Sequence, residues 1–159
     1  MGLLNVGIGE WAVSDDASDI LKTYALGSCV AGIIYDARLA IAGLIHVALP
    51  DSKVDPGRAA SMPGYFADTG LPRMIEDMKL RGAVRANVWV KLAGGAAVMD
   101  PAGLFDIGKR NVLAAKRILW GSSLGPIAED TGGAMGRTVS ISVADGETVV
   151  YSGQRQWTI

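Results

Sequence analysis

The chain has 159 residues, half of them hydrophobic, and a formal net charge of -1 at pH 7, which predicts a single domain over residues 1–159 with a sizeable core. The near-neutral charge argues against nucleic acid as a partner, and the absence of an apolar run of about 18 residues argues against membrane insertion. One cysteine allows neither an internal disulfide nor a thiolate zinc site, so we expect a cytoplasmic protein without a bound metal.

The N-terminal segment alternates apolar with small or polar residues from Asn5 to Val13, which predicts one β-strand. Gly7 and Gly9 weaken that strand. They indicate either a bulge or the close approach of another backbone.

The only cysteine, Cys29, and the only histidine, His46, flank a predicted hairpin. Its arms are Val30–Tyr35 and Ile41–Val47, both rich in apolar and β-branched residues, with Asp36–Leu39 as the connection. With a tight two-residue turn, Cys29 would lie directly opposite His46, with Cβ atoms about 4.5–5.5 Å apart. Such a pair could supply a thiol nucleophile and the base that takes its proton.

This pairing depends on the parity of the connection. A loop longer by two residues at one end would make Cys29 and His46 diagonal neighbours on one face, whereas a one-residue bulge would place them on opposite faces. From the residues alone, an inert buried cysteine and a structural core histidine are the more common interpretation.

A third group could orient the histidine. Thr23 could accept the second ring N–H of His46 and fix its tautomer, and Asp36 and Asp51 compete for that role. An aspartate would be the stronger partner, but Asp36 belongs to the far turn of the hairpin.

Gly27 and Ser28 stand immediately before the cysteine. Such a glycine-containing turn can leave backbone N–H groups unpaired, and these could hold a developing oxyanion. In enzymes that use such a donor, its loss costs about 2.7–4 kcal/mol of activation free energy.

The middle of the chain predicts a long loop over Asp51–Gly64, an amphipathic helix that begins near Asp68 and ends before Gly82, and a strand over Arg85–Leu92. The irregular segment 99–105 then carries three large apolar side chains, Met99, Leu104 and Phe105. These side chains either pack into the core or form an exposed patch for a protein partner.

The C-terminal third predicts a helix over Ile107–Trp120, a short strand over Ile127–Asp130 and a hairpin that turns at Asp145-Gly146. Residues 154–159 either add an edge strand or fray. Arg110 and Asn111, near the start of the helix, could bind an anion, but hydrogen bonds to a neighbouring loop are the favoured interpretation. Strands at the start, middle and end with two helices between them predict an α+β fold.

Several separate motifs resemble, in the same order, those of the chemotaxis protein family CheD, whose members are chemoreceptor glutamine deamidases. The resemblance covers most of the chain. Its motifs are Thr23, Leu26-Gly27-Ser28-Cys29-Val30, His46-Val47-Ala48-Leu49-Pro50, Tyr65-Phe66-Ala67-Asp68-Thr69, Lys91-Leu92-Ala93-Gly94-Gly95-Ala96, Ile107-Gly108-Lys109-Arg110-Asn111-Val112, Ala128-Glu129-Asp130-Thr131-Gly132-Gly133 and Gly136-Arg137.

The resemblance implies a Cys-His-Thr triad in which Cys29 is the nucleophile, His46 the base and Thr23 the third member. It implies a layered fold with a β-sandwich-like core of mostly antiparallel strands covered by two main helices, similar to toxin-type deamidases. The implied substrate is the cytoplasmic signalling region of chemoreceptors, where glutamine becomes glutamate without a cofactor. The family also implies docking to a CheC-type phosphatase, with Met99, Leu104 and Phe105 as the contact patch.

Two other functions stay open. The first is a largely non-catalytic adaptor that binds receptor and phosphatase while Cys29 is idle. The second is another cysteine enzyme that acts on amides, such as a peptidase or a transglutaminase-like protein. Rapid alkylation of Cys29 near neutral pH would favour an enzyme over the adaptor.

Overall fold

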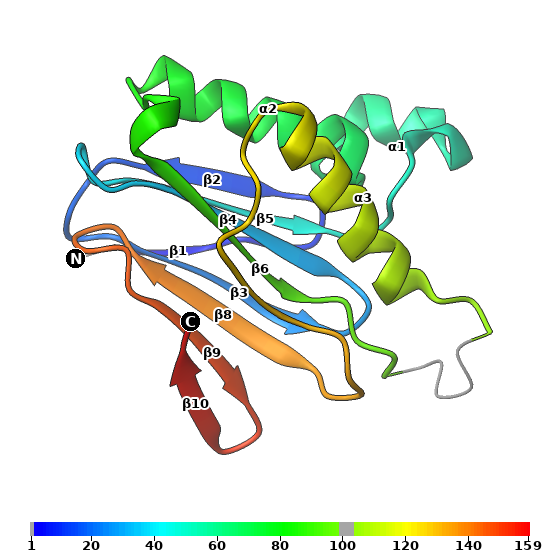
Figure 1. The fold of residues 1–159 in the computed structure, drawn as a ribbon. Helices are drawn as coiled ribbons and strands as arrows, with labels where there is room; N and C mark the ends of the chain where they lie inside the picture. Colours follow the sequence, from blue (N-terminus) through cyan, green and yellow to red (C-terminus); the bar gives the residue numbers. More distant parts are fainter. Residues whose placement is uncertain (1, 99–103) are drawn as a thin grey trace.

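The computed structural model describes residues 2–98 and 104–159, which form two stacked β-sheets and a layer of helices (Figure 1). Sheet A contains, in spatial order, β1 (Leu3–Asn5), β3 (Ile20–Leu26), β8 (Arg137–Ser142), β9 (Thr148–Ser152) and β10 (Arg155–Thr158). Sheet B contains β2 (Trp11–Ser14), β5 (Ile41–Val47), β4 (Val30–Asp36), β6 (Val88–Gly94) and β7 (Ala128–Thr131). Helices α2 (Ala67–Leu80) and α3 (Ile107–Gly121) cover the face of sheet B that points away from sheet A.

Neighbouring strands are antiparallel except for two parallel pairs, β1 with β3 and β6 with β7. The α+β prediction, with a sandwich of mostly antiparallel strands under two main helices, is therefore confirmed. None of the helices within the described ranges has the length and apolar character needed to cross a membrane.

Strand β4 lies at the centre of the fold, and every one of its residues is buried. Ala31, Ile33 and Tyr35 pack between the two sheets, whereas Val30 and Ile34 pack against the helices. Because both faces are covered, the strand reads as a continuous apolar run rather than an alternation. The same division places the even-numbered residues of β5 between the sheets, with Leu44 as an example.

The hairpin of β4 and β5 has the predicted arms but a wider connection than the tight turn. Pairing runs from Val30 opposite Val47 to Asp36 opposite Ile41, which leaves a four-residue turn. The Asp36 carboxylate accepts the amide protons of Arg38 and Leu39 at 2.9 Å each, and this holds the wider turn. The loop is thus longer by two residues, an even change that keeps the predicted face of every side chain.

The N-terminal prediction of one strand over Asn5–Val13 is wrong, because the chain changes sheets within it. Strand β1 pairs with β3 in sheet A, and β2 pairs with β5 in sheet B. The crossing uses the glycines: Gly9 has a φ of +78°, and the Gly7 amide donates to the side chain of Glu10. The alternation of apolar residues is the same in both sheets, so periodicity could not reveal the break.

The segment Asp51–Gly64 is also not the predicted loop, since it contains two 3-10 helices, Ser52–Val54 and Pro63–Tyr65, and helix α1 (Pro56–Ser61). The Asp55 side chain accepts the Arg58 amide proton at the start of α1, and proline occupies the first turn. Aspartate followed by proline is a signal for the start of a helix. The prediction missed it because the segment was interpreted as one long polar loop.

The remaining elements follow the sequence closely. Helices α2 and α3 lie where the apolar stripes predict them, and the hairpin of β8 and β9 turns at Asp145-Gly146. Strand β10 adds the predicted edge. Strand β6 begins only at Val88, because Arg85–Asn87 forms a 3-10 turn.

Candidate active site

Thr23 and His46 meet between the two sheets, although they come from different ones. The Thr23 hydroxyl oxygen lies 2.6 Å from Nδ1 of His46 and 2.6 Å from the Val6 carbonyl oxygen. Thr23 is fully buried and His46 is 1% exposed. The contact therefore links β3 of sheet A to β5 of sheet B in a site that excludes water.

The hydrogen bonds of Thr23 determine which nitrogen of His46 carries the proton. A carbonyl oxygen can only accept, so the single hydroxyl proton of Thr23 goes to Val6. Nδ1 of His46 must then donate to the hydroxyl oxygen. This tautomer leaves the lone pair on Nε2, which is buried and has no hydrogen-bond partner among the described residues. Nε2 is therefore available as a base.

A bulge in β3 sets the boundary of this site. The register of β3 with β8 shifts between Thr23 and Leu26, and Ala25 adopts a φ of +58°. The extra residue exposes Tyr24 and Ala25 and returns Leu26 to the core. Bulges of this kind redirect a chain next to functional sites, and here the chain turns directly into the segment that carries Cys29.

Cys29 lies just before β4 and on the same face of sheet B as His46. Ala31 pairs with His46, so extending the register makes Cys29 its diagonal neighbour, a separation typically about 7–8 Å. The cysteine is free and partly buried, and it packs against the cluster between the sheets. Burial raises the pKa of the Cys29 thiol above its usual value, an effect that its own backbone N–H partly opposes. The resting thiol is therefore protonated.

His46 is neutral at physiological pH, because burial lowers its pKa to about 4. Between pH 6.5 and 4 the unfolded chain binds a proton at this residue that the folded chain does not. The free energy of unfolding should therefore fall as the pH drops through this window. Above the window, the contribution of His46 to stability is fully present. The two limits differ by about 3 kcal/mol in the free energy of unfolding, from about 1.4 kcal/mol per pKa unit.

Urea unfolding at a series of pH values tests this expectation, with His46→Leu as the matched variant. The native protein should lose stability between pH 6.5 and 4 more steeply than the variant does. Parallel pH dependences would show that His46 is not held neutral by burial.

The two aspartates considered as partners for His46 are engaged elsewhere. Asp36 holds the far turn of the hairpin and also accepts the Val84 amide proton. Asp51 accepts the Lys53 amide proton at the start of a 3-10 helix. Thr23 thus occupies the position beside Nδ1 of His46.

The carbonyl groups of Gly27, Ser28 and Cys29 are all hydrogen-bonded to the surrounding layers. The Ala96 amide donates to Gly27 at 2.8 Å, and the Gly95 amide donates to Cys29 at 2.8 Å. The Ser28 carbonyl accepts from the side chain of Asn111 in α3. This confirms the favoured interpretation of Asn111 as a residue that binds a neighbouring loop.

The backbone N–H groups of the same segment differ in their availability. The Gly27 amide donates to the Ala25 carbonyl at 3.1 Å. Within the described part of the chain, the amides of Ser28 and Cys29 have no hydrogen-bond acceptor. Gly27 therefore supports the turn, and among the described residues nothing accepts a hydrogen bond from the two following amides.

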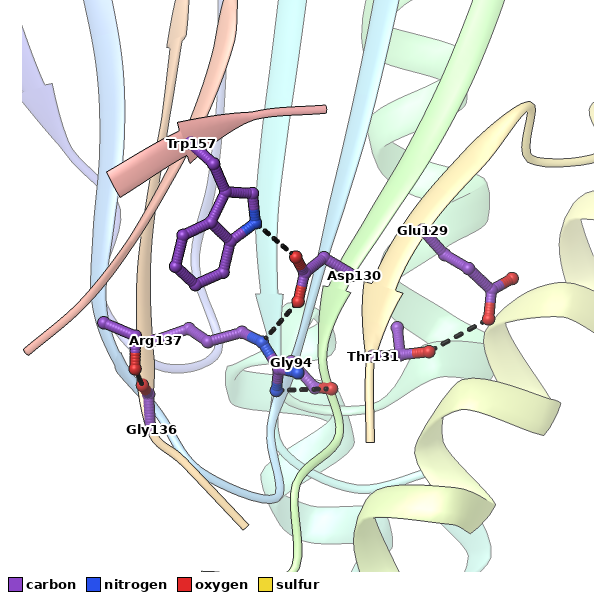
Figure 2. Close-up of polar contacts among 8 residues, drawn as sticks. Gly94, Glu129, Asp130, Thr131, Gly136, Arg137 and Trp157 are labelled. Atoms are coloured by element: carbon purple, nitrogen blue, oxygen red, sulfur yellow. Dashed lines mark hydrogen bonds and ion pairs between the residues drawn. The ribbon is translucent and has the colours of Figure 1, made fainter. Parts of the chain in front are cut away.

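A polar network around Asp130 joins the two sheets (Figure 2). Asp130 in β7 lies between Trp157 and Arg137, which both donate to its carboxylate, Arg137 at 2.8 Å. Arg137 also donates to the Gly94 carbonyl, which accepts the Gly132 amide as well. The Gly95 amide donates to the Cys29 carbonyl, and Gly95 directly follows the end of β6 at Gly94. The network therefore positions the end of β6 that contacts Cys29. Sequence reasoning found Asp130, Arg137 and the glycines only as family motifs, and Trp157 only within the segment 154–159, and it did not foresee their contacts.

Arg137→Met should lower the free energy of unfolding by about 2 kcal/mol, because it strips a charged partner from Asp130. The two side chains are only 10% and 20% exposed, so the remaining carboxylate is poorly solvated. Urea unfolding measures the loss. The double variant with Asp130→Asn should recover part of it, since no unpaired charge remains; a double variant less stable than the single one would contradict this account.

A pocket of about 490 Å³ adjoins the segment before Cys29. Its walls are mostly small residues, among them Gly27, Ser28 and the stretch 95–97, and its rim includes Phe105. Leu104 and Phe105 are 79% and 64% exposed, which rules out, for both, the alternative in which they pack into the core. Met99, the third member of the predicted patch, lies outside the described residues.

Comparison with known proteins gives one family. The family model described as CheD chemotactic sensory transduction matches residues 48–152, a stretch that begins just after His46. Relatives match over the full length. A protein of Syntrophotalea carbinolica named "Probable chemoreceptor glutamine deamidase CheD" is 48% identical, with 100% of each chain covered.

Two further relatives carry the same name. The protein of Solibacter usitatus is 42% identical over 95% of this chain and 89% of its own. The protein of Methanococcus maripaludis is 37% identical over 99% of both chains. Each of these comparisons covers 95% or more of this chain. The chain therefore belongs to the CheD family.

Proposed function

We propose that this protein is a glutamine deamidase that acts on chemoreceptors through a Cys29-His46-Thr23 triad. The observation that carries the proposal is the buried Thr23–His46 pair, which directs the proton to Nδ1 and leaves Nε2 as a base. Cys29 lies on the same face one diagonal position away. The names of the full-length relatives supply the reaction and the substrate class.

In the proposed reaction, Nε2 of His46 takes the thiol proton as Sγ of Cys29 attacks the side-chain amide carbon of glutamine. The free backbone N–H groups of Ser28 and Cys29 stabilise the oxyanion. Protonated His46 then gives its proton to the departing ammonia. Water, deprotonated by His46, then attacks the thioester. The C–S bond breaks, glutamate is released, and His46 returns the proton to Sγ of Cys29.

The neutral resting state fits this sequence of steps. Burial raises the pKa of the Cys29 thiol and lowers the pKa of His46, so no thiolate–imidazolium pair exists before substrate binds. Proton transfer therefore accompanies attack on the amide. We therefore expect alkylation of resting Cys29 to be slow near neutral pH in an active enzyme as well, so slow alkylation does not favour the adaptor, contrary to the expectation from the sequence.

The substrate region would be the cytoplasmic signalling part of a chemoreceptor, which places the protein in the cytoplasm. A CheC-type phosphatase is the proposed partner, and the exposed side chains of Leu104 and Phe105 are the proposed contact. They line a second pocket of about 380 Å³ together with Leu49, Val54 and Arg110. The apolar wall of this pocket lies beside the start of α3, and it could bind apolar side chains of a partner protein.

Ammonia release tests the proposed activity against the adaptor alternative. A purified receptor signalling region is incubated with the protein, and ammonia and complex formation are both measured. The deamidase should release ammonia from a molar excess of receptor, with no cleavage of the receptor chain. Binding without ammonia release would support the adaptor, and cleavage would support a peptidase.

Thr23→Val should lower kcat by about 10²-fold, because the histidine loses the acceptor that fixes its tautomer. Valine keeps the shape of threonine but leaves the Val6 carbonyl and Nδ1 of His46 unpaired. Thr23→Ser retains the hydroxyl and is the matched control. Steady-state kinetics of both variants measure the effect, and equal activity of the two would remove Thr23 from the triad.

A further inference from the structure

Asn111 connects the two chain segments that carry the cysteine and the histidine. Its side-chain amide nitrogen donates to the Ser28 carbonyl at 2.9 Å and to the Ala48 carbonyl at 3.0 Å. Ser28 directly precedes Cys29, and Ala48 lies two residues after His46. Both acceptors are carbonyl oxygens, which only accept, so the orientation of the amide is determined.

The bond to Ser28 determines where the Cys29 amide points. The Ser28–Cys29 peptide is trans, so its C=O and N–H groups point in opposite directions. Because the carbonyl points to α3, the Cys29 N–H points away from the helix. It belongs to the same residue as Sγ, and it partly opposes the rise in the pKa of the Cys29 thiol that burial causes. No described residue accepts its proton.

We propose that Asn111 is a positioning residue that orients the Ser28–Cys29 peptide so that the Cys29 N–H faces the oxygen of the amide under attack. The inference rests on the proposed function and deepens it. Asn111 does not touch the substrate in this arrangement, because it is fully buried behind the segment it holds.

The choice of asparagine at this position supports a role beyond packing. Its Oδ1 atom is buried without a hydrogen-bond partner among the described residues, which is unfavourable for folding. An apolar residue would avoid that cost in a helix face that packs through Val112 and Ala115. Only a side chain with two N–H groups holds both carbonyls at once.

Two reactions of Cys29 separate an oxyanion effect from an effect on the thiol. Addition of the thiol to an aldehyde forms a C–S bond, opens the C=O bond and places the thiol proton on the oxygen, so the oxygen needs a donor. Displacement of iodide from iodoacetamide forms no oxyanion. The aldehyde probe is a receptor peptide in which the glutamine side-chain amide is replaced by an aldehyde.

The test compares the native protein with Asn111→Ala, Asn111→Asp and the control Leu119→Ala, a buried residue of the same helix that packs in the helix–sheet core. Both Asn111 variants should lower kcat and aldehyde affinity by about 10²-fold, with KM and the iodoacetamide rate nearly unchanged. Circular dichroism measures the folded fraction of each variant. If Asn111→Ala does not fold, the comparison uses Asn111→Asp, which keeps the shape of the side chain.

Two results would overturn the inference. One is a loss of kcat and aldehyde affinity no larger than in Leu119→Ala. The other is an equal loss in aldehyde and iodoacetamide reactions, which would place the effect on the thiol. Failure of the proposed function itself looks different, because the native protein would then release no ammonia while the aldehyde comparison could still be made.

Discussion

Cys29→Ala is expected to abolish deamidation, with a loss in kcat on the order of 10⁶ for a nucleophile that acts within a triad. The side chain is small and only partly buried, so its removal leaves a minor gap in the cluster between the sheets. The variant should fold and should still bind the receptor. Ammonia release under single-turnover conditions measures the loss with the greatest sensitivity.

Cys29→Ser is the matched control for this substitution. It keeps a nucleophilic atom in nearly the same place, but a hydroxyl is far harder to deprotonate than a thiol whose ordinary pKa is about 8.5. A neutral His46 gives it little help, so Cys29→Ser should be nearly as inactive as Cys29→Ala. Substantial turnover by either variant would exclude covalent catalysis by Cys29.

His46→Ala is expected to lower kcat by about 10²–10⁴-fold, the usual contribution of a general acid–base group. The substitution removes Nε2, the base proposed to activate Cys29, and leaves the Thr23 hydroxyl bonded only to Val6. Kinetics above pH 9 provide the internal check, because direct ionisation of the thiol should then restore part of the activity. Wild-type activity in the variant at neutral pH would remove His46 from the mechanism.

The acid side of the native pH profile follows from the same residue. Burial lowers the pKa of His46 to about 4, so the imidazole remains a base throughout the neutral and mildly acidic range. Turnover should fall only as the pH approaches that value. A decline centred near the ordinary histidine pKa of about 6.5 would show that Nε2 is solvated in the active protein.

The sequence predicted the shared face of Cys29 and His46, but not their diagonal placement, because strand parity survives an even error in loop length. The turn proved to be four residues long, yet the two side chains stayed on one face, since an even change moves a residue along a strand without reversing it. The apolar stripes of α2 and α3 and the turn at Asp145-Gly146 were equally readable, because each is a local signal.

Contacts between layers could not be predicted in this way. Thr23 lies in another sheet from His46, and a bulge at Ala25 separates it from Cys29, so alternation could not place its hydroxyl. Asn111 was recognised as a loop-binding residue, but its link to both catalytic segments depends on how α3 packs over sheet B. The change of sheet between β1 and β2 could not be predicted either. Strands of both sheets alternate apolar and polar residues with the same period of two, so the pattern continues across the break.

The most direct test is peptide mass spectrometry of a chemoreceptor signalling region after incubation with the protein, with Cys29→Ala in parallel. We predict that particular glutamines become glutamates with the native protein alone. That result would establish the thiol-dependent deamidation and identify its sites. Equal conversion by the Cys29→Ala variant, or binding of the receptor by the native protein without any conversion, would contradict the proposed function.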